Sequence, residues 1–87
     1  MSINELRSIT TFVRTAELGS LSKAALAQQI SPQAASKALG QLEQYLGVRL
    51  FHRTTRSMSL TEEGQRFFEA VQPAVISLHQ SLHAARQ

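Results

Sequence analysis

The sequence predicts a mainly α-helical chain, in which three helices and a short two-stranded hairpin are followed by a fourth, longer helix. Three observations support this. Apolar residues recur every three or four positions in four segments, which is typical of helices with one buried face. Serine, threonine and glycine residues stand where these segments begin or end, as capping residues do. Two short apolar pieces, 50–52 and 58–60, flank a basic polar stretch and indicate the hairpin; we expect residues 1–60 to form one domain and residues 61–87 the long helix.

The first helix is expected to begin near Ser2, because Ser2 and Glu5 have the spacing of a capping box. Its inward-facing stripe recurs at helical spacing and consists of Ile3, Leu6, Ile9, Phe12, Val13 and Ala16. We expect this helix to serve as scaffold. Arg7 and Arg14 are interpreted as solvated charges, and contact with a phosphate backbone is the alternative.

The most informative segment begins at Ser31 and predicts a helix whose outer face meets a ligand. Ser31 is a natural N-cap, and Pro32 fits the first helical position, where a missing N–H costs nothing. The inner face is apolar and carries Ala35, Leu39, Leu42 and Leu46. The outer face has long polar side chains with one charge among them, from Gln33, Lys37, Gln41 and Gln44. A helix entrance without acidic residues suits phosphates and base edges; an ordinary amphipathic surface helix is the alternative.

A shorter helix is expected just upstream, from about Leu21 to Gln29, after the introducing pair Gly19-Ser20. The pair Ala24-Ala25 offers small side chains where another helix crosses closely. Only Ile30 and Ser31 separate this helix from the next one. Two helices joined by so tight a link predict a helix-turn-helix.

Gly47 is expected to end the second helix of this motif as a C-cap. The apolar pieces that follow, Leu50-Phe51-His52 and Met58-Ser59-Leu60, are predicted to pair as a hairpin, or wing. The tip between them suits insertion beside a phosphate backbone, because it carries Arg53, Thr54, Thr55 and Arg56. Together these segments predict a winged helix-turn-helix followed by a long linker or dimerisation helix.

These residues match the pattern of a known family. The pattern runs from about Leu6 to Phe68 and consists of Ala24-Ala25, Ser31, Ala34, Ser36, Leu42-Glu43, Leu46-Gly47, Leu50-Phe51, Arg53, Arg56, Leu60-Thr61 and Gly64. It resembles the N-terminal DNA-binding domain of LysR-type transcriptional regulators. One position departs, because Gln28 stands near the end of the first motif helix, where that family usually has leucine. We expect Leu26 to cover part of the gap, or the Gln28 stem to lie against the core with its amide in water.

The resemblance implies sequence-specific binding of double-stranded DNA by a homodimer that reads an interrupted inverted repeat and regulates transcription. It also implies a much larger effector-binding domain, which 87 residues cannot hold. A small-molecule inducer would act only through that absent domain. The chain is therefore interpreted as an isolated DNA-binding fragment, with a naturally short protein as the alternative.

Thr61 is expected to cap the last helix, and Glu62 and Glu63 suit its positive end. The apolar residues of this helix step by three and four positions, as in a coiled-coil seam, and are Phe68, Val71, Val75, Leu78, Leu82 and Ala85. A helix of about 25 residues reaches roughly 37 Å, which overshoots a small core and predicts a partner. The resembling family pairs this helix with its copy in a dimer. Pro73 predicts a kink.

Composition agrees with one small domain, since 87 residues that are 43% hydrophobic can hold one modest core. The absence of cysteine and of an apolar N-terminal run predicts no disulfide, no signal peptide and no membrane span, as expected of a cytoplasmic, nucleoid-associated protein. The formal net charge is +3. From Lys23 to Arg56 five basic residues stand against Glu43 alone, a net +4 that indicates a nucleic-acid footprint, with a chance cluster as the alternative.

The sequence predicts neither an enzyme nor a cofactor. The chain contains no aspartate, and no set of nucleophile, base and orienting group can be nominated. His79 and His83 share a helical face at a spacing that can hold a metal. Because no cysteine or acidic residue lies nearby in the sequence, we interpret them as solvated histidines and expect no metal site.

Two functions remain open, a DNA-binding module and a protein-interaction module that assembles through the seam without DNA. The acid-free helix face and the arginines of the wing favour DNA, because an interaction surface should instead carry aromatic or aliphatic anchors. The predicted DNA contacts are Ser31, Pro32, Gln33, Ala34, Ser36, Lys37, Gln41, Arg53, Thr54, Thr55 and Arg56. Gln33 is assigned to base edges, Lys37 to a base edge or a phosphate, and Ser31 to a phosphate.

Overall fold

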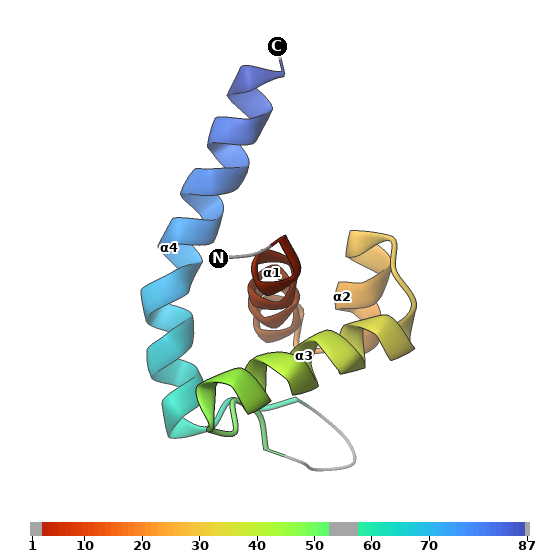
Figure 1. Cartoon of the computed structure of the whole chain (residues 1–87), viewed down its shortest axis with the longest axis vertical. Helices are drawn as coiled ribbons and strands as arrows, with labels where there is room; N and C mark the ends of the chain where they lie inside the picture. The colour runs from red at the N-terminus through yellow and green to blue at the C-terminus, as the bar shows by residue number, and fades with distance from the viewer. Residues whose placement is uncertain (1–2, 53–57, 87) are drawn as a thin grey trace.

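Four α-helices account for most of the chain (Figure 1). The computed structural model describes residues 3–52 and 58–86. The helices are α1 (Ile3–Leu18), α2 (Leu21–Gln28), α3 (Pro32–Leu46) and α4 (Glu62–Ala85). Their order and lengths confirm the predicted mainly α-helical fold class.

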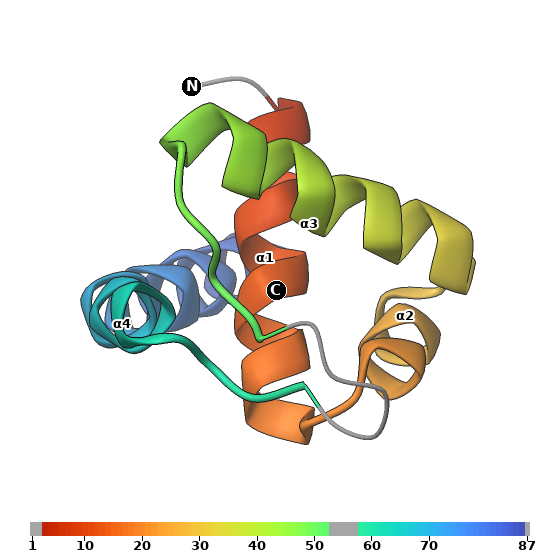
Figure 2. The ribbon, with the colours of Figure 1, turned by 90° about the horizontal axis from the view of Figure 1, so that it is seen from below.

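Helix α1 lies at the centre of the molecule, and each of the other three helices packs against it (Figures 1 and 2). Phe12 of α1 is fully buried, and its ring centroid lies 5.3–6.3 Å from the rings of Phe51, Phe67 and Phe68. The rest of this buried cluster consists of Val13, Leu39, Leu42, Leu50 and Val75. One core therefore joins the helix-turn-helix, the base of the hairpin and the first half of α4.

Side-chain caps fix where three of the helices begin. The hydroxyl oxygens of Ser20, Ser31 and Thr61 each accept a hydrogen bond from the backbone N–H three residues on, at 3.2, 3.0 and 2.9 Å. Each cap pairs an amide that the helix itself leaves free, which stabilises the helix by about 1 kcal/mol. The predicted caps at Ser31 and Thr61 are confirmed.

The turn between α2 and α3 is as tight as the sequence predicts. Helix α2 ends at Gln28, one residue before the expected end, because Gln29 adopts a left-handed backbone conformation with φ 59° and caps the helix. The Ile30 N–H then donates to the Ala25 carbonyl at 3.0 Å. Ala24 and Ala25 are fully buried, which confirms their predicted place at the helix crossing.

The expectation for Leu26 is wrong, and the expectation that the Gln28 amide lies in water is wrong for its oxygen atom. Leu26 is 79% exposed and covers no gap, while Gln28 Oε1 is buried and has no hydrogen-bond partner in the described part of the chain. Helical spacing gives the reason, because position 28 lies on the same face of α2 as the buried Ala24 and Ala25, and position 26 lies opposite. The amide oxygen is therefore directed into the protein rather than into water.

The base of the predicted wing is paired in the antiparallel sense. Phe51 and Leu60 form a β-bridge, and the His52 N–H donates to the Ser59 carbonyl at 2.8 Å. The pieces 50–52 and 58–60 thus lie side by side as expected, although as an isolated bridge rather than as longer strands. The tip of the hairpin lies outside the described residues.

The junction between α3, the hairpin and α4 depends on a buried carboxylate. Glu43 is 8% exposed, and its Oε2 accepts hydrogen bonds from the backbone N–H groups of Leu50 at 2.7 Å and Phe51 at 3.4 Å. The Thr61 N–H donates to the Leu50 carbonyl at 3.0 Å, and the Thr61 hydroxyl donates to the Arg49 carbonyl at 2.6 Å. Gly64 then brings the first turn of α4 against the Leu50 carbonyl, where no Cβ fits.

Helix α4 runs unbroken through Pro73 and bows along its length (Figure 1). The expected kink is therefore a gradual curve, since the helix continues on both sides of the proline. Its first half packs on the core of its own chain and its second half extends beyond the other helices (Figure 1).

The expected partner-facing seam is accordingly divided. Phe68 and Val71 are partly buried against the core, and Val75 is 5% exposed. These three residues are covered within their own chain because α4 passes along α1 before it leaves the core. Further along, Leu78 is 37% exposed and Leu82 54%.

We predict that Gly64→Ala destabilises the fold by about 1–3 kcal/mol or more, because the new methyl group would overlap the Leu50 carbonyl. Gly40→Ala is the matched control. Its Cβ meets nothing within 4 Å and lies inside α3, so this change should raise the free energy of unfolding by up to about 1 kcal/mol. Urea denaturation of both variants measures the difference, and equal stabilities would contradict the close approach at Gly64.

We also predict that Gln28→Leu raises the free energy of unfolding by about 1–3 kcal/mol, because it removes a buried carbonyl oxygen without a partner. The control is Gln80→Leu, at an exposed position on α4, which should change stability by less than about 0.5 kcal/mol. A Gln28→Leu variant no more stable than the parent would show that the amide is satisfied in solution.

Candidate nucleic-acid interface

The outer face of α3 is a continuous exposed polar surface. The predicted contact residues on this helix and its cap are all exposed, and they are Ser31, Pro32, Gln33, Ala34, Ser36, Lys37 and Gln41. The opposite side of the helix is buried, with Ala35, Ala38, Leu39 and Leu42 between 0% and 8% exposed. The structure therefore brings this part of the predicted site together on one rigid helix.

The hydroxyl group of Ser31, which caps α3, can still donate a hydrogen bond to a ligand. Ser31 Oγ accepts from the Ala34 N–H at 3.0 Å, which uses one of its lone pairs. A serine hydroxyl also has one proton to donate. Since Ser31 is exposed, its hydroxyl is accessible to a ligand at the helix N-terminus, where the partial positive charge of the helix also favours an anion.

Exposed charge on the helix-turn-helix is of one sign among the described residues. Lys23, Lys37 and Arg49 are exposed, whereas Glu43, the only acidic residue between positions 19 and 61, is buried beneath the hairpin base. The other acidic residues belong to α1 and α4. A polyanion that approaches α3 thus meets basic and neutral polar groups.

The other predicted contacts belong to the wing. Arg53, Thr54, Thr55 and Arg56 lie outside the described residues. The bridge between Phe51 and Leu60 joins the hairpin base to the core directly beside the junction at Glu43. The hairpin is therefore anchored to the same scaffold as α3.

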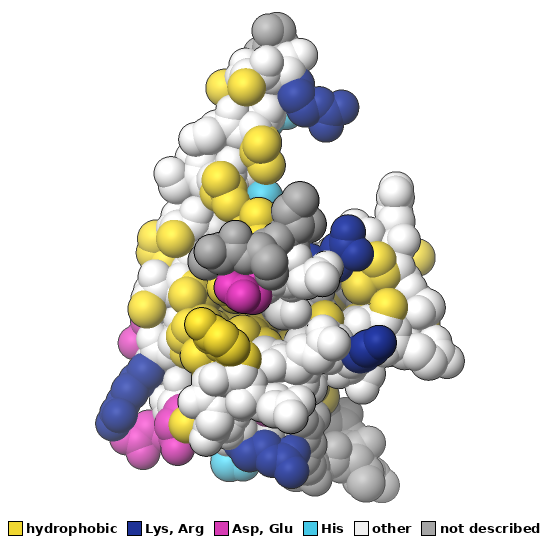
Figure 3. All heavy atoms as spheres, in the orientation of Figure 1, with side chains coloured by type: hydrophobic (Ala, Val, Ile, Leu, Met, Phe, Trp, Pro, Cys, Tyr) yellow, Lys and Arg dark blue, Asp and Glu magenta, His cyan; other side chains and the backbone are white. Residues whose placement is uncertain are grey.

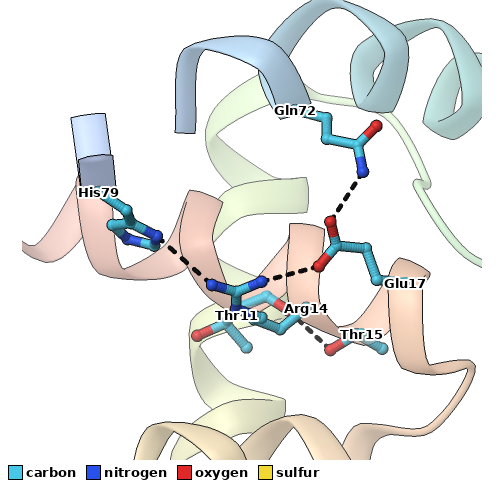
Figure 4. Close-up of polar contacts among 6 residues, drawn as sticks. All are labelled: Thr11, Arg14, Thr15, Glu17, Gln72 and His79. Atoms are coloured by element: carbon cyan, nitrogen blue, oxygen red, sulfur yellow. Dashed lines mark hydrogen bonds and ion pairs between the residues drawn. The ribbon is translucent and has the colours of Figure 1, made fainter. Parts of the chain in front are cut away.

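A polar network links α4 to α1 (Figure 4). Arg14 Nη1 donates to Glu17 Oε1 at 2.9 Å, and Gln72 Nε2 donates to Glu17 Oε2 at 2.7 Å. Arg14 Nη2 also lies 3.4 Å from His79 Nδ1. His79 is thus paired with a cation, which disfavours the alternative of a metal ligand at this position.

The described part of the chain contains no group of three or more His, Cys, Asp or Glu side chains placed to hold a metal ion. None of its helices is both long and apolar enough to cross a membrane. An apolar hollow of about 340 Å³ does open where α1, α3 and α4 meet, and Figure 3 shows hydrophobic side chains gathered there. Its lining includes Ile9, Tyr45, Leu46 and Phe67.

A short α2, a tight turn and an α3 with an exposed polar face define a helix-turn-helix protein, to which the paired hairpin adds a wing. The model of the lysR family of bacterial regulatory helix-turn-helix proteins matches residues 6–65. The chain belongs to this family. The predicted resemblance is therefore confirmed.

Relatives in this family are named as transcriptional regulators. CrgA from Neisseria meningitidis is 45% identical over 64 residues, which are 74% of this chain and 21% of CrgA. PerR from Escherichia coli is 40% identical over 80 residues, 92% of this chain and 26% of PerR. The chain thus spans about a quarter of the length of these relatives.

Solved structures share the fold. The complex of BenM DBD with catB site 1 DNA has a TM-score of 0.82 at 28% identity and covers 93% of this chain and 91% of that one. The CbnR DBD–DNA complex has a TM-score of 0.79, also at 28% identity, and covers 93% of each chain. OxyR of Corynebacterium glutamicum in its oxidized form reaches 0.86 at 32% identity, over 94% of this chain and 26% of OxyR.

Sequence reasoning identified the face of α3 and its cap, but it missed two kinds of residue. In the sequence, Glu43 is recognisable only as a match to the family pattern and as an acidic residue within a basic stretch. Nothing in the sequence predicts that it binds the backbone of the hairpin base. Glu17 and Gln72, which lie 55 positions apart, have no sequence signal that would pair them. Both cases involve side chains whose partners are set by packing between distant segments.

Proposed function

We propose that this chain is the DNA-binding module of a transcription regulator and that it binds double-stranded DNA with α3 in the major groove. The observation that carries the proposal is the exposed, acid-free face of α3 from Ser31 to Gln41. An α-helix fits the major groove, where each base pair presents a distinct set of donors and acceptors. The similarity to the BenM and CbnR domains, whose structures are DNA complexes, supports the same use here.

The residues on this face have separate roles. Gln33 stands in the first turn of α3, where its amide can pair with N6 and N7 of adenine. Lys37, one turn further, reaches guanine acceptors or a phosphate, and Ser36 and Gln41 lie beside it. The free hydroxyl proton of Ser31 and the helix N-terminus hold a phosphate and set the register of the helix on the duplex.

The wing supplies backbone contacts in this proposal. Arg53, Thr54, Thr55 and Arg56 are assigned to the phosphates or the minor groove beside the recognition site, with Arg56 the principal contact. Support comes from the anchoring of the hairpin base beside α3 and from the basic composition of the tip. Such contacts add affinity for every sequence alike.

The chain is proposed to act as a homodimer on an interrupted inverted repeat in the cytoplasm. The support is the second half of α4, which extends beyond the core and exposes Leu78, Leu82 and Ala85. A second copy that covers these residues would place two α3 helices in a two-fold arrangement, and such symmetry requires a repeat of inverted half-sites.

A protein-interaction module without DNA is the competing function. The apolar hollow around Tyr45 and Leu46 is the feature that favours it, because such side chains serve as interface anchors. This hollow lies at the C-terminal end of α3, whereas the face from Ser31 to Gln41 is polar. The two surfaces meet at Gln41, which lines the hollow, while the residues from Ser31 to Lys37 lie outside the hollow and remain available to DNA.

The test of DNA binding is a titration with duplex DNA at several salt concentrations. We expect the logarithm of the affinity to fall linearly with the logarithm of salt concentration, by about 0.9 per phosphate contact. A library of random duplexes should yield an inverted repeat with a spacer. A chain that binds no duplex at low salt would exclude the proposed function.

Gln33→Ala is predicted to lose discrimination at one position in each half-site, worth about 1–3 kcal/mol, since the variant can no longer make a bidentate pair. The measurement compares affinities across single-base variants of the selected site. Gln80→Ala, which removes the same amide from the exposed part of α4, should leave the whole panel unchanged. Equal weakening on every duplex by Gln33→Ala would reduce Gln33 to a positioning residue.

Leu78→Asp combined with Leu82→Asp is predicted to give monomers, because it places two charges in the apolar surface that a second copy would cover. The control is Ser77→Asp with Ser81→Asp, which adds the same charge at the neighbouring exposed positions. Sedimentation velocity measures both. A Leu variant that stays dimeric would assign the dimer contact to another surface.

A further inference from the structure

A second hollow lies between α1 and α3, beside the face that is proposed to read DNA. Its volume is about 260 Å³, and its lining includes Asn4 and Arg7 from α1 and Ala34, Lys37 and Gln41 from α3. The sequence favoured a solvated charge for Arg7 and left contact with a phosphate backbone as the alternative. The structure instead places it around the same hollow as Lys37, a predicted DNA contact.

The lining has the chemistry of an anion site. It contains two cations, one from each helix, and the amides of Asn4 and Gln41, but no acidic residue. Arg7 forms no ion pair with the described acidic residues, whereas Arg14 on the same helix is paired with Glu17. Two cations around one hollow repel each other unless an anion lies between them, and a guanidinium matches the geometry of a phosphate with two parallel hydrogen bonds.

The position of the hollow fits a duplex that holds α3. A helix with its side chains is about 10–12 Å wide and the major groove about 12 Å, so the two phosphate strands pass along the two flanks of the helix. The positions of α3 that line the hollow, 34, 37, 38 and 41, form one such flank. Lys37 borders both this flank and the proposed base-reading face.

We infer that the hollow between α1 and α3 holds a phosphate of the DNA backbone, with Arg7 as its principal ligand and Lys37 as the second cation. The inference rests on the proposed function and extends it to α1. The guanidinium of Arg7 fixes one phosphate strand on the side of α3 that faces α1. The contact carries no sequence information and sets the position of α3 in the groove.

The first test is Arg7→Ala, measured as the salt dependence of binding to a duplex selected by the parent chain. We expect the slope to fall by about 0.9, and the affinity for all duplexes to fall by the same factor with the sequence preference unchanged. Arg7→Lys should restore most of the slope. Arg86→Ala removes the same charge from the far end of α4 and should leave the slope unchanged.

The outcomes separate this inference from the proposed function. If the parent chain binds DNA and Arg7→Ala keeps the full slope, the phosphate site is absent and the proposed function stands. If the parent binds no DNA, the proposed function itself fails. Folding is not at risk, since the Arg7 side chain is exposed and only its backbone carbonyl accepts a bond, from Thr11 at 2.9 Å.

A second measurement distinguishes a DNA phosphate from a free anion. Inorganic phosphate is titrated into the parent chain and into Arg7→Ala while the amide signals of residues 4, 7 and 37 are followed by NMR. Shifts that require Arg7, together with the loss of salt slope on DNA, support the site. Tight binding of free phosphate combined with an unchanged DNA slope would make the hollow a free-anion site and overturn the inference.

Discussion

The backbone of Leu50 is the point on which the relative placement of the elements depends. Its N–H is bound by the buried carboxylate of Glu43 at the end of α3, and its carbonyl is bound by the N–H of Thr61 at the start of α4. Hydrogen bonds to a charged group are worth about 1.5–3 kcal/mol, and more is lost when a buried charge is left without its partner. A short loop is thus fixed to two helices through its main chain, and the side chains of Leu50 and Phe51 fill the core beneath it.

This constraint reaches the candidate site through the core. Because Glu43 binds the backbone of Leu50 and Phe51, the base of the hairpin is held in a fixed place relative to α3. Because Gly64 lets the first turn of α4 approach Leu50, α4 starts at the same junction and passes along α1. The packing of Val75 and its neighbours on the core sets the course of α4, and the exposed contacts among Arg14, Glu17 and Gln72 add polar links between α4 and α1.

Much of the fold could be predicted from the sequence, because its signals are local. Ser31 with Pro32, Thr61 with its two following glutamates, and Gly47 mark helix ends by interactions within one turn, and all three are confirmed. The face of α3 follows from helical spacing in the same way. The environment of Gln28 could not be predicted in this way. The burial of its amide oxygen depends on which segments pack over α2, and no local sequence pattern specifies that packing.

The prediction that the apolar stripe of α4 faces a partner along its whole length is wrong in part, for a related reason. Periodicity reports that one side of the helix is apolar, but it does not say which molecule covers that side. Val75 is buried in the chain's own core and Phe68 and Val71 are partly buried against it, while the continuation of the stripe is exposed. The first half of α4 therefore closes a small core, while its second half leaves an apolar surface exposed.

The charged residues are also divided between the scaffold helices and the helix-turn-helix. The acidic residues of the chain lie on α1 and α4 or, like Glu43, beneath the hairpin, while the exposed helix-turn-helix is basic in the described residues. Some of the acidic residues pair locally, as Glu62 does with Arg66 and Glu17 with Arg14. The glutamates offset the charges of the two arginines with which they pair. Lys37 and Arg7, in contrast, form no ion pair with the described acidic residues. A chain with a net charge of only +3 thereby leaves the exposed charges of the helix-turn-helix and of the loop after it basic in the described residues, on the side proposed to bind a polyanion.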